Sequence, residues 1–423
     1  MANILIIFFT IGYLLIVLES FVKINKSAIA LLMGVLCWSA YAIYTSDKEL
    51  LSHQLVEHLS SASGILFFLL GAMTIVELVD AHDGFEIIRS AITTTNKRKL
   101  SWLLGLITFF LSAILDNLTT TIVMVSLIRK IIPEKNDRLI FAGLIVIAAN
   151  AGGAWSPIGD VTTTMLWIGG QITASNIIVK TLLPSLVSYL IPAIVVSFQL
   201  KGSIQAVSSN EKYSSSSSKT WERNLVFALG LISLFMVPVF KAITHLPPFM
   251  GVLIGLGLMW VITEILHHEK DDAEKGIYSV NHALRKIDTP SILFFLGILL
   301  AISALESVGI LVNTASYLQH SIGDIRIVTI LIGLLSAVVD NVPLVAATQG
   351  MYGLDQFPTD HMFWEFLAYC SGTGGSILII GSAAGVAAMG MEKINFLDYL
   401  KKTGWLALIG YLAGAVCYLL LNS

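Results

Sequence analysis

Long apolar stretches recur along the whole chain of 423 residues, separated by short polar ones. Most are about 20 residues long, which is the length that a helix needs to cross a hydrocarbon layer of roughly 30 Å. They predict membrane-spanning helices over residues 2–19, 26–45, 64–82, 138–169, 175–199, 222–242, 247–267, 288–310, 363–391 and 395–420. The polar stretch 45–60 predicts at most a short amphipathic helix on the surface.

Two further apolar segments, 101–129 and 325–350, each carry Asp-Asn near the middle. A spanning helix would place Asp116 and Asp340 where the bilayer is driest. A hairpin that enters and leaves on one side would instead place them at its tip. Such non-helical backbone is tolerated at membrane depth where it is buried in protein or lines a cavity. We therefore expect a re-entrant hairpin in each segment.

Matching motifs in the two halves predict an internal repeat. The sequence "LSAILDNLTTT" matches "LSAVVDNVPLV" at an offset of 224 (340 minus 116), and "GGAWSPIGD" matches "GGSILIIGS" at an offset of 222 (374 minus 152). Each half then holds five crossings plus one hairpin, and an odd number of crossings turns the second half upside down. Inverted repeats with broken helices at the midplane are typical of secondary transporters.

The predicted fold is therefore an all-α polytopic membrane protein with two inverted repeats. The first repeat covers residues 1–200, with a hairpin at 101–129 and a broken helix at 138–169. The second covers residues 222–423, with a hairpin at 325–350 and a broken helix at 363–391. A polar, Ser-rich segment at 201–221 is expected to be a cytoplasmic linker.

Composition and charge agree with a membrane protein and orient it. Hydrophobic residues make up 56% of the chain and charged residues 13%, whereas soluble domains contain about a quarter charged residues. With both termini outside, all but four of the 25 Lys and Arg fall on the cytoplasmic side, where these residues collect. The four exceptions are Lys48, Lys180, Lys241 and Arg326. The first hairpin then opens to the cytoplasm and the second to the outside.

Polar side chains gather where the helices are expected to break. Gly152, Gly153, Pro157 and Gly159 disfavour a continuous helix, and a broken helix exposes carbonyl oxygens that can coordinate a cation. An ionised carboxylate in mid-membrane is costly and usually faces a cavity or pathway. The candidate ion- and proton-binding residues are Asp116, Asn117, Thr119, Asn150, Ser156, Asp160, Thr162, Thr163, Asp340, Asn341, Thr373 and Ser376.

Other interpretations of these residues stay open. Ser, Thr and Gly in membrane helices are often packing residues. Glu77 and Glu306 align in the repeat and are either interfacial charges or a candidate proton path. The chain contains no Ser/His/Asp array, phosphate-binding loop or nucleotide motif, so we do not expect an enzyme.

The Asp-Asn hairpin pair and the "GGAWSPIGDVTTT" break resemble the NhaD-type sodium/proton antiporters of the ion transporter (IT) superfamily, over nearly the whole chain. The resemblance implies an antiporter of the cell inner (cytoplasmic) membrane, in which Na⁺, or alternatively Li⁺, exchanges for H⁺. It implies a homodimer with a scaffold region and a mobile transport region, and no cofactor or nucleic acid. Carried over by position, it places Na⁺ at Asp116, Asn117, Asn150, Asp160 and Asp340.

Two other substrates of the superfamily were weighed against Na⁺. Members that carry dicarboxylates have Ser-Asn-Thr at the hairpin tips, whereas this chain has Asp in place of the Ser at both tips. An ionised Asp would repel an anionic substrate, and a neutral metalloid would not need three acidic residues. We therefore prefer exchange of Na⁺ for H⁺, with the two ions competing for the same carboxylates, to a dicarboxylate symporter or a metalloid efflux permease.

Overall fold

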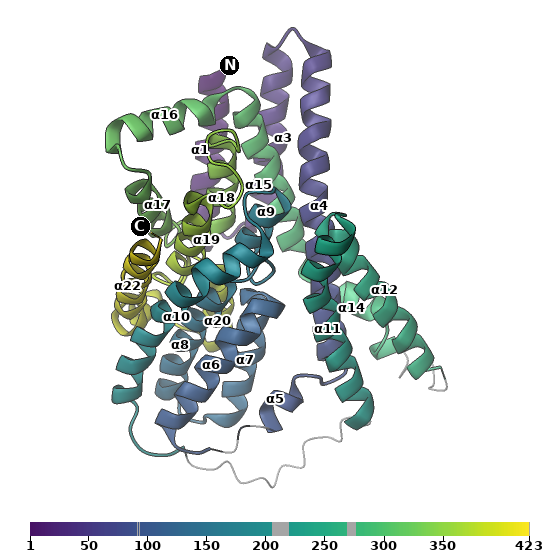
Figure 1. Cartoon of the computed structure of the whole chain (residues 1–423), viewed down its shortest axis with the longest axis vertical. Coiled ribbons are helices and arrows are strands. Elements are labelled where there is room, and N and C mark those ends of the chain that lie inside the picture. Colours follow the sequence, from purple (N-terminus) through teal and green to yellow (C-terminus); the bar gives the residue numbers. More distant parts are fainter. Residues whose placement is uncertain (91, 93, 205–219, 269–275, 423) are drawn as a thin grey trace.

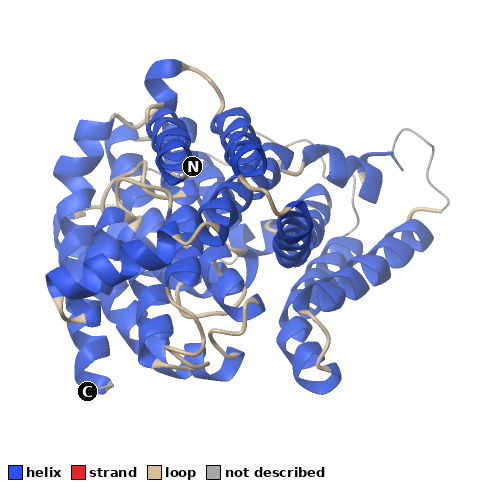
Figure 2. Ribbon diagram, turned by 90° about the horizontal axis from the view of Figure 1, so that it is seen from above, coloured by secondary structure: helices blue, strands red, loops and turns tan. Residues whose placement is uncertain are grey.

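The computed structural model describes residues 1–90, 92, 94–204, 220–268 and 276–422. Within these residues the regular elements are all helices, apart from one isolated β-bridge between Asn96 and Ser203 (Figure 2). Eight helices in the described part of the chain are long and apolar enough to cross a membrane. The prediction of an all-α polytopic membrane protein is confirmed. Residues 205–219 of the expected linker lie outside the described residues.

Each half of the chain contains an Asp-Asn helix pair that is followed by a broken helix (Figure 1). The first half contains α1 (Ala2–Val17), α2 (Glu19–Val22), α3 (Lys26–Tyr44), α4 (Lys48–Ala81), α5 (Glu86–Ser90), α6 (Lys97–Leu115), α7 (Asn117–Ile131), α8 (Lys135–Gly153), α9 (Val161–Ile168) and α10 (Ala174–Gln199). The second contains α11 (Thr220–Thr244), α12 (Pro248–Leu266), α14 (Val280–Lys286), α15 (Thr289–Ser307), α16 (Ile310–Ile322), α17 (Ile325–Leu335), α18 (Asn341–Met351), α19 (Met362–Gly374), α20 (Ala383–Glu392), α21 (Phe396–Tyr399), a π-helical turn (Leu400–Gly404) and α22 (Trp405–Leu421). The Asp-Asn pairs are α6–α7 and α17–α18, and the broken helices are α8–α9 and α19–α20.

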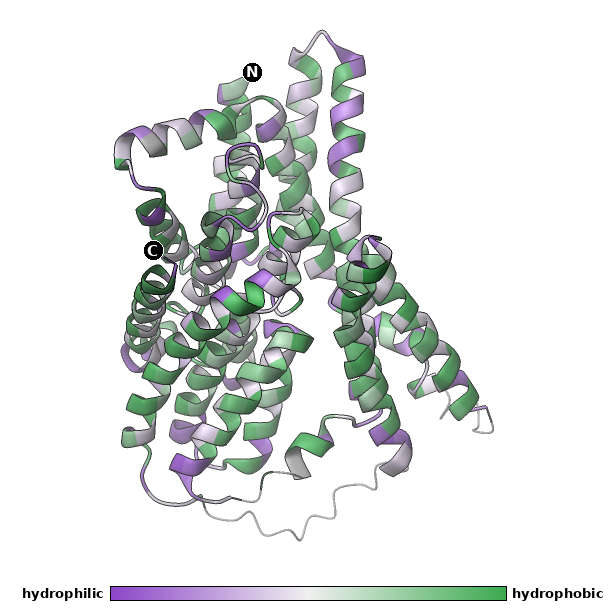
Figure 3. Cartoon of the chain, in the orientation of Figure 1, coloured by the Kyte–Doolittle hydropathy of each residue, from purple (hydrophilic) through white to green (hydrophobic). Residues whose placement is uncertain are grey.

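Helix α4 corrects the interpretation of the polar stretch 45–60. The helix begins at Lys48, not at residue 64, so this stretch is part of one long helix and not a separate surface helix. Asp47 caps it by accepting a 2.9 Å hydrogen bond from the backbone N–H of Leu50. The polar upper part of α4 projects from the upper end of the molecule beside α3 (Figure 3). Lateral helix α16 was likewise not predicted, and Gly323, with φ of 78°, makes the turn from it into α17.

The first helix of each Asp-Asn pair contacts a broken helix through glycine. A Cβ added to Gly152 in α8 would lie 2.1 Å from the carbonyl oxygen of Phe109 in α6. A Cβ added to Gly374 in α19 would lie 2.0 Å from the carbonyl oxygen of Gly333 in α17. Such distances are far inside van der Waals contact, so only glycine allows these helices to approach so closely. The same contact therefore positions the same elements in both halves.

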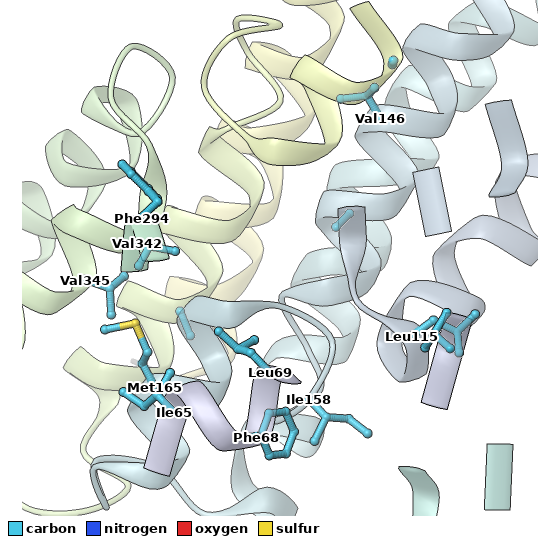
Figure 4. Close-up of a cluster of buried hydrophobic side chains, with 14 of the residues drawn as sticks. Ile65, Phe68, Leu69, Leu115, Val146, Ile158, Met165, Phe294, Val342 and Val345 are labelled. Atoms are coloured by element: carbon cyan, nitrogen blue, oxygen red, sulfur yellow. The ribbon is translucent and has the colours of Figure 1, made fainter. Parts of the chain in front are cut away.

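The helices form two groups that each draw on both halves of the chain. One group contains α1, α3, α4, α11, α12 and α15, and the other contains α6, α7, α8, α10, α17, α19, α20 and α22. Helix α18 contacts α15 of the first group and α19 of the second. Apolar side chains of α4, α9, α15 and α18 pack near this junction, among them Ile65, Phe68, Leu69, Met165, Phe294, Val342 and Val345 (Figure 4).

We predict that Gly152→Ala and Gly374→Ala each destabilise the fold. Inserting a methyl group into a closely packed contact typically costs about 1–3 kcal/mol, and here the neighbouring atom is a backbone carbonyl that cannot rotate away. The melting temperature of the purified protein in detergent measures the effect. In Gly257→Ala the added methyl meets nothing within 4 Å, so that variant should melt at the wild-type temperature or slightly above it. If Gly152→Ala and Gly374→Ala both melt at the wild-type temperature, the helices are not as close at these glycines as the structure shows.

Candidate functional site

Four helices begin at breaks, and each begins with a polar residue that caps it. Asp116 accepts a hydrogen bond from the backbone N–H of Thr119 at the start of α7 (2.8 Å), and Asp340 accepts one from Val342 in α18 (3.3 Å). The caps of α9 and α20 are Asp160 and Ser382. A carboxylate at a helix N-terminus satisfies an N–H that has no partner within the helix and is favoured by the helix dipole. The acidic residues at the tips and breaks thus also start the helices.

Three of these residues, Asp116, Asp160 and Asp340, line one cavity of about 50 Å³ between the two helix groups. Sites for organic ligands usually enclose about 300–1,000 Å³, whereas a water needs about 10–15 Å³ by the same measure. The cavity therefore suits an ion with a few waters. No cluster of three or more His, Cys, Asp or Glu among the described residues could hold one metal ion. A cation there would have to share carboxylates with neutral oxygens.

The tip of the second Asp-Asn pair contacts the break of the first half. Asn341 donates a 3.0 Å hydrogen bond to Oδ2 of Asp160, and the hydroxyl of Thr162 donates another of 3.0 Å to the same oxygen. Asp160 is only 2% exposed, so these neutral donors replace water around a buried carboxylate. A bound cation would find Asp160 already held in place.

The tip of the first pair is linked to the break of the second half through Asn150 of α8. Asn117 donates a 3.0 Å hydrogen bond to Oδ1 of Asn150, whose amide nitrogen donates to the hydroxyls of Ser376 and Ser382 at 2.9 Å each. All four side chains are buried. Among the described residues this network has no carboxylate, and Ser382 stands 222 residues after Asp160 (382 minus 160). The two networks therefore differ in charge.

The structure brings together only some of the other predicted residues. Thr119 uses its hydroxyl to hold Oδ2 of Asp116 at 2.8 Å. Ser156 accepts from the backbone N–H of Ile158, Thr163 donates to the carbonyl oxygen of Asp160, and Thr373 donates to that of Tyr369. Such local bonds to the backbone are the usual structural role of Ser and Thr in helices.

A wider cavity of about 570 Å³ adjoins the small one and shares Lys26, Leu118 and Ser291 with it. Its charged lining residues are six acids and three lysines, namely Glu19, Glu77, Asp80, Asp83, Glu86, Asp288, Lys26, Lys130 and Lys286. A cavity with an excess of acidic groups raises the local concentration of cations. Glu77 lies on its wall, 3.3 Å from Lys286, whereas Glu306 lies beside Gly350 of α18 and does not line this cavity.

Sequence reasoning missed Lys26. It was counted among the basic residues of a cytoplasmic loop, but Nζ of Lys26 donates a 3.0 Å hydrogen bond to Oδ2 of Asp340. The two residues are 314 positions apart, and a lysine before an apolar segment is the ordinary mark of a membrane helix end. No local signal distinguishes this lysine from the others.

Comparison with known proteins gives consistent matches. A family model described as "Citrate transporter" (CitMHS) matches residues 13–364. "Sodium/proton antiporter 2" of Arabidopsis thaliana is 46% identical over 98% of this chain and 98% of its own length, and "Sodium/proton antiporter 1" of that plant is 50% identical over 98% and 72%. "Na(+)/H(+) antiporter NhaD" of Vibrio cholerae is 32% identical over 99% of this chain and 91% of its own length.

We predict that two adjacent threonines differ in their effect on cation binding. Thr162→Val removes a donor from the Asp160 carboxylate, and a hydrogen bond to a charged group is worth about 1.5–3 kcal/mol, so the Na⁺ concentration for half-maximal stabilisation should rise about tenfold or more. This concentration is measured from the melting temperature in a series of NaCl concentrations, with choline chloride at the same concentrations as the Na⁺-free control. Thr163→Val, equally buried but bonded only to the backbone, should change this concentration less than about twofold. Equal effects would contradict the assignment.

Proposed function

The chain belongs to the citrate transporter (CitMHS) family and to its NhaD-type sodium/proton antiporters, and we propose that it exchanges Na⁺ for H⁺ across a membrane. The observation that carries the proposal is the cavity of about 50 Å³ lined by Asp116, Asp160 and Asp340. The names of the relatives from Arabidopsis thaliana and Vibrio cholerae support it.

Exchange follows from competition for the carboxylates. Burial favours the protonated form of a carboxyl group, and a bound cation favours the ionised form. A proton that binds therefore expels Na⁺, and Na⁺ that binds expels a proton. Acids that line one small cavity titrate as a coupled set, so the transported proton belongs to the group and not to one residue.

An anion is a poorer fit, although the family model is described as a citrate transporter. A tricarboxylate would face three carboxylates in a cavity far below the size of organic ligand sites. The wider cavity beside it carries six acidic residues against three lysines, which also disfavours an anion. A neutral metalloid would use neither feature.

The two halves are proposed to be inverted repeats, residues 1–200 and 222–423, each with five crossings and one re-entrant hairpin. The Asp-Asn pair followed by a broken helix in each half, and the matched glycine contacts of Gly152 and Gly374, support this arrangement. The group that contains α3 and α15 would be the scaffold, and the group that contains α8 and α19 would be the mobile transport region. The protein would work as a homodimer in the cell inner (cytoplasmic) membrane, with both termini extracytoplasmic.

The exchange test uses everted membrane vesicles from cells that express the chain. Added Na⁺ should dissipate an imposed pH gradient, with an apparent Na⁺ affinity that rises at alkaline pH because fewer protons compete. Asp116→Asn, Asp160→Asn and Asp340→Asn keep the size of the side chain and remove its charge, so each should abolish or gravely reduce the response. The exposed Asp355 offers a matched control, and Asp355→Asn should respond like the wild type.

Two outcomes would contradict the proposal. Vesicles that respond to citrate or a dicarboxylate and ignore Na⁺ would show an anion transporter. Wild-type exchange in all three aspartate variants, at wild-type levels of folded protein, would exclude these residues as the coupling acids.

The topology is tested by labelling single cysteines in a background without the three native ones. Cysteines at Lys97 and Lys130, at the far ends of α6 and α7, should both react with a membrane-impermeant reagent only from the cytoplasm. Cysteines at His320 and Asp355 should react only from outside. Labelling of the first two positions from opposite faces would make residues 101–129 a crossing and would refute the inverted repeat.

A further inference from the structure

Lys26 is the first residue of α3, and its ammonium lies on the acidic N-cap of α18, the helix that contacts both helix groups. Its Nζ is 3.0 Å from Oδ2 of Asp340, the N-cap of α18. The two side chains are 26% and 15% exposed, so the pair is mostly shielded from solvent. The Lys26–Asp340 pair therefore joins the α3–α15 group to the tip of the second Asp-Asn pair.

The backbone around Lys26 is firmly held in its own helix group. The N–H of Lys26 donates to Oε1 of Glu19 at 2.9 Å, and the side chain of Asn25 caps α3 by accepting from Ser27. The hydroxyl of Ser27 donates to the carbonyl oxygen of Pro290 at the start of α15 at 2.6 Å. Because the backbone is held, the contact with Asp340 can be made or broken only by a change in the conformation of the Lys26 side chain.

The partners of the three cavity carboxylates are of different kinds. Asp116 accepts from Thr119, and Asp160 accepts from Thr162 and Asn341, which are all neutral donors. Asp340 instead has a full positive charge beside it. The Lys26 ammonium, which also lies 4.4 Å from the centre of the Phe294 ring, lines the same cavity as the three acids. A cation that enters this cavity therefore finds the Asp340 carboxylate already paired with the Lys26 ammonium.

We propose that Lys26 is an internal competitor of Na⁺ for Asp340, displaced when Na⁺ binds and returned when it leaves. The inference rests on the proposed exchange of Na⁺ for H⁺. The Lys26 ammonium and Na⁺ are both monovalent cations, so the competition is between two cations of equal charge for one carboxylate. In the empty protein the Lys26–Asp340 pair holds the tip of α18 to α3 and α15. Bound Na⁺, or a proton on Asp340 during the return step, breaks this link, and the mobile group is then free to move.

A link that breaks only on loading has a consequence for coupling. An exchanger must not return empty, because an empty return would let Na⁺ flow without a counter-ion. The Lys26–Asp340 pair opposes that return, since moving the two helix groups apart would separate two opposite charges in a shielded place. Lys26 is thus a positioning residue that contributes to specificity and coupling.

Lys26→Met and Lys26→Gln test the inference in the full chain, purified and reconstituted into liposomes. With the competitor removed, the Na⁺ concentration for half-maximal thermal stabilisation should fall about tenfold, given the strength of a charge at this distance in a partly shielded site. Net ²²Na⁺ efflux at equal pH on both sides, with a pH-sensitive dye inside, should also exceed the accompanying H⁺ entry. Lys26→Arg keeps the cation and should retain coupled flux.

Lys130→Met is the matched control, since Lys130 lines the wider cavity at the far end of α7 but does not line the small one. It should change the Na⁺ concentration less than about twofold, which separates competition at Asp340 from a general loss of positive charge. Unchanged Na⁺ affinity and intact coupling in both Lys26 variants would overturn the inference. So would slower exchange at unchanged affinity, which would show a merely structural contact. Absence of Na⁺ exchange in the wild type would instead refute the proposed function.

Discussion

An ionised carboxylate within an apolar helical protein must be given polar partners, because hydrocarbon offers it none and the cost of leaving it bare is at least a few kcal/mol. The chain meets this constraint by breaking its helices. A helix that starts within the protein has N–H groups without partners, and Asp116, Asp160 and Asp340 each accept one. The free backbone N–H groups at the helix starts thus donate hydrogen bonds to the aspartate carboxylates. The small cavity lies beside these carboxylates.

Positions that the sequence motifs pair between the two halves carry different side chains at the site. Asn150 reaches Ser376 and Ser382, while its counterpart in the repeat is Gly372 (150 plus 222). A Cβ on Gly372 would lie 3.0 Å from Cβ of Ala154 and 3.5 Å from Oδ2 of Asp160, so Gly372 lies beside the buried carboxylate. One position thus carries an amide that links α8 to the second break, and the other carries no side chain beside Asp160.

The sequence predicted what depends on local pattern and missed what depends on distant contacts. Glycine, proline and Asp-Asn disfavour a continuous apolar helix, so the breaks near Asp116, Asp160 and Asp340 could be placed from the residues alone. The start of α4 could not, because a polar helix that continues beyond the hydrocarbon has no apolar pattern to mark it. Whether Thr162 or Thr163 faces the carboxylate depends on the geometry of one helical turn, and the contact of Lys26 depends on residues 314 positions away.

The carboxylates of the two Asp-Asn pairs are held by different contacts. Asp116 has φ of 77° and ψ of 161°, a region nearly reserved for glycine, where another residue costs about 1–3 kcal/mol. Two hydrogen bonds from Thr119 offset part of that strain and fix the carboxylate within its own turn. Asp340 has an unstrained backbone, with φ of −49°, and its carboxylate is held across the junction by Lys26. The carboxylate of Asp116 is therefore bonded within its own turn, whereas that of Asp340 is bonded to the start of α3, so loss of the Lys26 contact would remove a link between helices and loss of the Thr119 contacts would not.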